Sequence, residues 1–126
     1  MTEHEECTEP LVDPSVITGL QAELGGDATI VSSFVQTYII LLPRRISRLY
    51  RALDAQDMDE AMDAVLSLRV SSEMVGAVCI YRLAMQLETG MRLLRRGERL
   101  PELSAQLREL ERFVSGTIEE LETPFR

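Results

Sequence analysis

Apolar residues recur at every third or fourth position along five stretches of the chain, and this spacing limits the possible folds more than any other feature. The clearest stretch lies near the C-terminus, where the apolar positions are Leu103, Leu107, Leu110, Val114, Ile118 and Leu121. Such spacing places the side chains on one face of an α-helix. No segment shows the alternation with a period of two that a half-buried strand requires. The pattern therefore predicts an all-α chain.

Capping residues divide the sequence into helices. Asp13 followed by Pro14 is typical of a helix start, and Gly25-Gly26 predicts the end of that short first helix. Asp27 predicts the start of a long second helix. We expect the third helix to begin at Asp57 or Asp59, to run to about Val75 and to stop at Gly76. Two further helices complete an up-down four-helix bundle with a short additional N-terminal helix across one end.

Length, charge and composition narrow the class of protein. A chain of 126 residues suffices for one domain with its own core; we expect residues 1–10 to be a disordered acidic tail and residues 11–124 to form the bundle. A net charge of −8 argues against a nucleic-acid partner. No apolar run approaches the ~20 residues that span a bilayer, and the polar N-terminus is not a signal peptide, so we expect a cytoplasmic protein. The spacing of Cys7 and Cys79 suggests two free thiols.

One stretch carries a family resemblance. Residues 65–77 read Val-Leu-Ser-Leu-Arg-Val-Ser-Ser-Glu-Met-Val-Gly-Ala, and Leu83 and Leu87-Glu88 follow. This stretch resembles the signature of histidine-containing phosphotransfer (HPt) domains, which runs Ala-His-x-Leu-Lys-Gly-Ser-Ser, three residues, then Gly-Ala. The resemblance covers roughly residues 13–121. It implies an HPt-like bundle and a place in bacterial two-component or phosphorelay signalling.

The resemblance also shows where the chain departs from the family. It places Leu66 at the position of the phospho-accepting histidine, and leucine has no nucleophilic nitrogen, so we expect no catalytic residue and no enzyme activity. Arg69 keeps the cation that the family supplies three residues later. Val70 replaces the glycine that lets a partner approach closely. We therefore expect a degenerate member that lacks the phosphotransfer chemistry.

The candidate site is the face of the third helix that the family turns towards its partners. The residues predicted there are Met62, Leu66, Arg69, Val70 and Glu73. We expect this face to bind a response-regulator receiver domain or a sensor histidine kinase without accepting phosphate. Two alternatives remain open at this point: Met62, Leu66 and Val70 belong to the core, or they form a homodimer interface in a structural adaptor.

The rest of the sequence contains few motifs that indicate catalysis or the binding of a cofactor or metal. No glycine-rich phosphate loop or metal-ligand spacing is present, so we expect no cofactor and no metal. An active phosphocarrier that uses a non-standard residue such as His4, the one histidine of the chain, is a further alternative. Two groups of arginines either dock an acidic partner or form solvated faces balanced by Asp and Glu. The groups are Arg44, Arg45, Arg48 and Arg51, and Arg92, Arg95, Arg96 and Arg99.

Overall fold

The computed structural model describes residues 10–95 and 102–125, and every regular element among them is helical. In chain order these elements are α1 (Pro14–Glu23), α2 (Ala28–Asp54), α3 (Met58–Val75), α4 (Val78–Arg95), α5 (Glu102–Arg112), α6 (Val114–Glu122) and the short 3₁₀ helix η1 (Thr123–Phe125). No helix in these residues is long and apolar enough to cross a membrane. The prediction of an all-α chain is confirmed.

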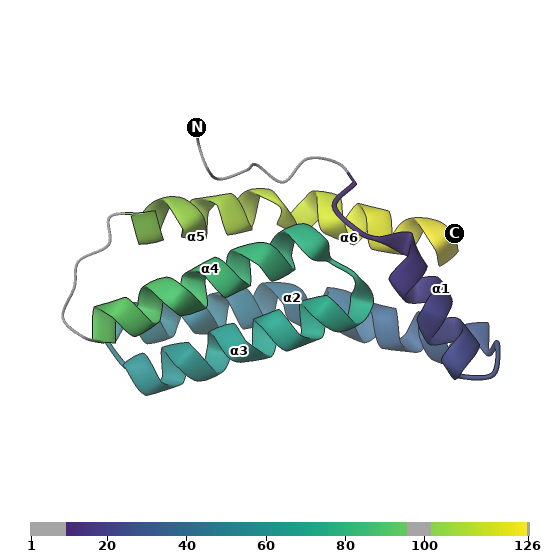
Figure 1. Cartoon of the computed structure of the whole chain (residues 1–126), viewed down its shortest axis with the longest axis horizontal. Coiled ribbons are helices and arrows are strands. Elements are labelled where there is room, and N and C mark those ends of the chain that lie inside the picture. The colour runs from purple at the N-terminus through teal and green to yellow at the C-terminus, as the bar shows by residue number, and fades with distance from the viewer. Residues whose placement is uncertain (1–9, 96–101, 126) are drawn as a thin grey trace.

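The helices form an up-down bundle (Figure 1), in which α3 packs against both α2 and α4. Helix α5 packs on α4 and α6 packs on α2, so that α5 and α6 together supply the fourth side of the bundle. Helix α1 lies across one end (Figure 1). The single last helix expected from the sequence is divided at Phe113, which has no side-chain capping bond and precedes α6.

The predicted helix starts are confirmed by their capping bonds. The Asp13 carboxylate accepts a hydrogen bond from the Ser15 amide, and Pro14 occupies the first helical turn. The Asp27 carboxylate caps α2 in the same way, and Asp57 rather than Asp59 caps α3. An aspartate side chain at these positions satisfies amides that the first helical turn leaves without partners.

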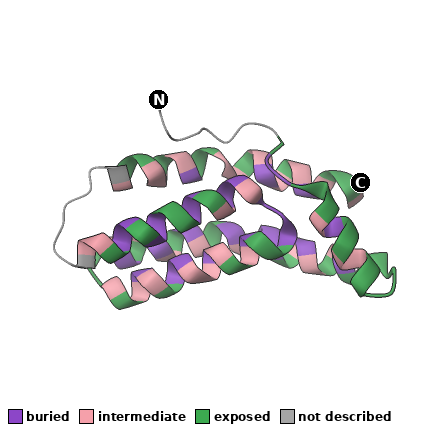
Figure 2. Ribbon diagram, in the orientation of Figure 1, coloured by how far each residue is buried: buried purple, intermediate pink, exposed green. Residues whose placement is uncertain are grey.

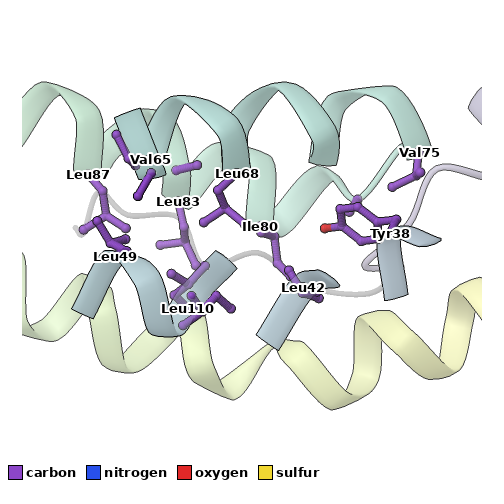
Figure 3. Close-up of a cluster of buried hydrophobic side chains, with 14 of the residues drawn as sticks. Tyr38, Leu42, Leu49, Val65, Leu68, Val75, Ile80, Leu83, Leu87 and Leu110 are labelled. Carbon is purple, nitrogen blue, oxygen red and sulfur yellow. The ribbon is translucent and has the colours of Figure 1, made fainter. Parts of the chain in front are cut away.

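The core fills the space between α2, α3, α4 and α5. Buried residues gather on the sides of the helices that face one another (Figure 2). Figure 3 shows their contributions: Tyr38, Leu42 and Leu49 from α2, Val65, Leu68 and Val75 from α3, Ile80, Leu83 and Leu87 from α4, and Leu110 from α5. The four helices therefore share one apolar core, as the spacing of the apolar residues predicts.

Gly76 fixes how α1 meets the end of α3. Its φ of +78° is left-handed, and its carbonyl accepts a 2.8 Å hydrogen bond from the Asp13 amide. A Cβ at this position would lie 2.8 Å from both the Asp13 carbonyl oxygen and the Val16 Cβ. Glycine is required both by the backbone conformation and by the close approach of α1.

A carboxylate on α6 ties down the segment that precedes α1. The Glu120 side chain accepts hydrogen bonds from the amide of Leu11, at 3.0 and 3.2 Å, and from the amide of Val12, at 2.9 Å. Leu11 and Val12 are themselves buried. The N-terminal segment is thus bound to the C-terminal helix, which holds α1 across the end of the bundle.

The expectation of two free thiols is wrong for Cys79. This residue is buried at the start of α4 and is disulfide-bonded, and no cysteine among the described residues is free. Cys7 and the rest of the predicted tail up to residue 9 lie outside the described residues. Sequence spacing failed here because it gives no information about which cysteines become neighbours in space.

Candidate functional site

Helix α3 turns one face towards the core of the bundle. Val65, Leu68 and Ser72 are all buried. The Ser72 hydroxyl shares a 2.8 Å hydrogen bond with the hydroxyl of Tyr38 on α2. Burial raises the pKa of Tyr38 to about 12, because the phenolate would lose its hydration. The bond satisfies two buried hydroxyls and joins α2 to α3.

The outer side of α3 carries an exposed apolar ridge. Leu66 is partly exposed, Val70 is 47% exposed and Met74 is 50% exposed. The three residues stand four positions apart, so they line one side of the helix. We call Leu66, Val70 and Met74 the α3 ridge. Val70 and Met74 are thus exposed on the surface and Leu66 is partly exposed, whereas the alternative drawn from the sequence places Met62, Leu66 and Val70 in the core.

The ridge differs in one member from the predicted stripe of Met62, Leu66 and Val70. Met62 is partly buried and packs against the core, so only part of it faces solvent. Met74 takes its place at the other end. Continuing the four-residue spacing beyond Val70 would have found Met74 from the sequence. Glu73, which is the acidic residue of the predicted set, is exposed beside the ridge.

Arg69 lies on the α4 side of the ridge, where it meets a buried carboxylate. Its Nε is 3.4 Å from Oε1 of Glu88, and Nη2 of Arg92 is 2.5 Å from Oε2 of the same residue. The Glu88 side chain is only 9% exposed, against 34% for Arg69 and 62% for Arg92. Sequence analysis had placed Glu88 in the family pattern without a role. Met85, three residues before Glu88, adds a 41% exposed apolar side chain on α4.

The α2 side of α3 carries a second ionic cluster. Arg48 binds Glu60 and Asp63 of α3 through its Nε and Nη2. The hydrogen bond from Arg48 lowers the pKa of Glu60, and the same bond raises the pKa of Arg48. The charge of Arg48 is therefore balanced by carboxylates of the same molecule. This agrees with the interpretation that the arginine groups form solvated faces balanced by Asp and Glu. Arg96 and Arg99 lie outside the described residues.

The described residues contain no histidine, since His4 lies outside them. They also hold no group of histidine, cysteine, aspartate or glutamate side chains arranged for a metal ion. What α3 and α4 present together is an apolar ridge flanked by an ionic cluster. This arrangement suits the binding of another protein.

Comparison with known proteins identifies the family. The sequence matches the Hpt domain over residues 33–122, which is most of the chain. The chain belongs to the Hpt domain family. Membership places this Hpt domain in phosphotransfer signalling of the two-component type, and it confirms the resemblance drawn from residues 65–77.

Solved structures agree with this Hpt domain in fold. It superposes on histidine-containing phosphotransfer protein B (HptB) from Pseudomonas aeruginosa PAO1 with a TM-score of 0.76, 23% identity and coverage of 93% of this chain and 96% of that one. It also superposes on the Hpt domain of a sensor hybrid histidine kinase from Shewanella, with a TM-score of 0.67, 13% identity and coverage of 90% and 92%. No curated protein gave a significant sequence match.

Proposed function

We propose that this Hpt domain binds a receiver domain or a sensor histidine kinase through the outer face of α3 and does not accept a phosphoryl group. The face comprises Met62, Leu66, Arg69, Val70 and Glu73, extended by Met74. By occupying the partner's docking surface, this face would sequester the partner or hold it in place. The observation that carries the proposal is the partly exposed, apolar Leu66 at the N-terminal end of the α3 ridge, where the family signature has its histidine.

The chemistry of the ridge supports binding without transfer. A phosphorelay histidine attacks phosphorus with a ring nitrogen lone pair, and Leu66 offers only carbon and hydrogen. Val70 adds a branched side chain, 47% exposed, where the signature has glycine. A partner active site that approaches Leu66 as closely as it would approach a histidine meets this extra bulk. The substitutions remove the nucleophile and obstruct the geometry that in-line transfer needs.

The energetics support a binding surface. Burying a side chain the size of valine, leucine or methionine contributes about 1.5–3 kcal/mol. Three such side chains stand in a row on the ridge, and α4 exposes a further one, Met85. Covering them with a complementary apolar surface is favourable enough to form the centre of an interface, and the charges of Glu73, Arg69 and Arg92 form a polar rim.

The proposal is tested by affinity capture from a lysate of the native host. Wild type, Leu66→Glu and Ile40→Glu are used as baits, and captured proteins are identified by mass spectrometry. Ile40 is the matched control because it is an aliphatic residue, 58% exposed, on α2 rather than α3. We expect wild type and Ile40→Glu to enrich the same receiver domains or histidine kinases, and Leu66→Glu to lose them. Equal enrichment by all three baits would refute the α3 face as the interface.

A second candidate function is a structural adaptor that forms a homodimer through the α3 ridge. The same exposed Val70 and Met74 favour it, since an isolated chain leaves them in contact with water. Sedimentation at increasing protein concentration separates the two functions. A dimer that Val70→Glu dissolves would support the adaptor, and a monomer at all concentrations would exclude it.

A further inference from the structure

The disulfide of Cys79 lies next to the turn that joins α3 to α4. Cys79 is fully buried near the start of α4 and is disulfide-bonded. The sequence has two cysteines, so within one chain the other sulfur can come only from Cys7. Cys7 itself lies outside the described residues. The described residues near Cys79 show why a bond between these two cysteines fits the fold.

Residues 10–13 connect α6 to the turn between α3 and α4, and we call them the N-terminal strap. The Glu120 carboxylate on α6 accepts hydrogen bonds from two strap amides. The Asp13 amide donates a 2.8 Å hydrogen bond to the carbonyl of Gly76. The strap is therefore fixed at one end to α6 and at the other to the turn that precedes Cys79.

The attachment of the strap keeps Cys7 within reach of Cys79. Asp13 is bonded to Gly76, which lies three positions before Cys79 in the sequence. Cys7 lies six positions before Asp13. Extended backbone advances by about 3.3–3.6 Å per residue, so six residues span up to about 20 Å. The chain is long enough to return from Asp13 to the start of α4.

We propose that a disulfide between Cys7 and Cys79 is a redox-sensitive switch that fastens the N-terminal strap, and with it α1, across the end of the bundle. On oxidation each thiol loses one proton and one electron. A small-molecule disulfide such as oxidised glutathione takes up both protons and both electrons and becomes two thiols. Reduction by the small-molecule thiol reverses this exchange. The inference goes beyond the proposed function and does not depend on it.

The location expected from the sequence supports a switch over a permanent cross-link. The polar N-terminal sequence predicts a cytoplasmic protein, and disulfides of cytosolic proteins are usually catalytic or redox-sensing. Exchange proceeds by attack of a thiolate on one sulfur of the bond. Because Cys79 is fully buried, an external thiol has to attack the other sulfur. The bond can then open without disturbing the core around Cys79.

The fold also supports a switch. The bundle is held together by the apolar core that α2, α3, α4 and α5 share. The strap is attached by its bonds to Glu120 and Gly76 and by the burial of Leu11 and Val12. Segments with few contacts open locally while the rest of the protein stays folded. A cross-link opposes such opening because it restricts the released segment. Breaking the disulfide should therefore loosen the strap and leave the bundle folded.

The first experiment identifies the bond and its response to thiols. The full-length protein is equilibrated in buffers with different ratios of reduced to oxidised glutathione, alkylated, and mapped by mass spectrometry without reduction. We expect a Cys7–Cys79 linked peptide in the oxidised buffers and two alkylated cysteines in the reduced buffers. A bond between two copies of the chain would overturn the proposal. A bond that persists in reduced glutathione would also overturn it, because the disulfide would then be a permanent cross-link.

The second experiment measures the strap directly by hydrogen exchange. In the reduced protein the amides of Leu11, Val12 and Asp13 should exchange at least about tenfold faster than in the oxidised protein. The internal control is the Asp57 amide, which bonds to the Ala52 carbonyl at 2.9 Å in the turn between α2 and α3. This turn lies at the opposite end of the bundle from α1 (Figure 1), and its exchange should not change. Equal exchange of the strap amides in both redox states would overturn the proposal.

Cys7→Ser is the matched variant, because it removes the bond without placing a hydroxyl in the buried site of Cys79. Its strap amides should exchange as fast as those of the reduced wild type and should not respond to glutathione. Exchange as slow as in the oxidised wild type would show that the strap needs no disulfide and would overturn the proposal. The comparison of oxidised with reduced wild type does not depend on any variant folding correctly.

Discussion

The inner and outer faces of α3 differ in how well they match the signature of the Hpt domain family. On the inner face, Leu68, Ser72 and the following Gly76 fit the family signature, and each has a structural role in core packing, a buried hydrogen bond or the contact with α1. On the outer face, Leu66 and Val70 depart from the signature; Leu66 is partly exposed and Val70 is exposed. We propose that the inner side of the helix maintains the fold and that the outer side is the binding face, where the phosphotransfer chemistry of the family is lost. Substitutions on the two sides should therefore have separable effects.

The largest effect is expected from an inner-face cavity. Leu68 is fully buried among α2, α3 and α4. Leu68→Ala removes this packing and leaves a void, so the free energy of unfolding should fall by about 2–5 kcal/mol. Urea unfolding followed by circular dichroism measures the change, with Val70→Ala as the control on the outer face. A loss below about 1 kcal/mol would show that the inner face does not dominate stability.

High pH should destabilise the protein through Tyr38. Its pKa is about 12 in the folded protein and 10.0 in the unfolded chain, so the folded state holds the proton more tightly. The contribution of the protonated Tyr38 to the free energy of unfolding is complete below pH 10 and is lost as the pH rises towards 12. Its size is about 2–3 kcal/mol. Unfolding free energies measured between pH 9 and 12 should show a steeper fall for wild type than for Tyr38→Phe, and identical slopes would contradict the burial of Tyr38.

The Tyr38–Ser72 hydrogen bond should contribute a smaller amount. Ser72→Ala leaves the buried Tyr38 hydroxyl without its partner and should cost about 1–3 kcal/mol of unfolding free energy. Combining Ser72→Ala with Tyr38→Phe removes both hydroxyls and should cost less than the sum of the two single changes. A double-mutant cycle measures this coupling, and strictly additive costs would mean that the bond contributes nothing.

The smallest effect on stability, and the largest on binding, is expected on the ridge. Met74→Ala and Val70→Ala shorten exposed side chains, so the free energy of unfolding should change by no more than about 0.5 kcal/mol. Binding to a captured receiver domain or kinase should weaken by about 1 kcal/mol or more, roughly fivefold. Calorimetry gives both quantities. Strong destabilisation by either change would place the ridge in the core and remove the distinction between the two faces.

Much of the fold could be predicted because its signals are local. The caps at Asp13 and Asp27 and the left-handed stop at Gly76 depend on a few neighbouring residues. The break near Phe113 was missed because no capping side chain marks it. The bond from Glu120 to the Leu11 amide joins the two ends of the described chain, and no local pattern indicates it.

The candidate site could be predicted only in part. The spacing of Leu66 and Val70 placed them on the outer side of α3, and their exposure agrees with that. The pairing of Arg69 with Glu88 could not be predicted, because it depends on how α3 and α4 align after Gly76. Met62 was assigned to the exposed stripe because a helical pattern does not show how far a neighbouring helix covers its edge.

The central claim is that Leu66 occupies the histidine position of an Hpt domain that binds without carrying phosphate. The most direct test is to incubate a captured receiver domain, labelled at its phosphoryl group, with wild type, Leu66→His, Leu66→His combined with Val70→Gly, and His4→Ala. We predict no acid-labile label on wild type or His4→Ala, and label on the double variant at least. Label on wild type that disappears in His4→Ala would contradict the account and establish an active carrier that uses His4.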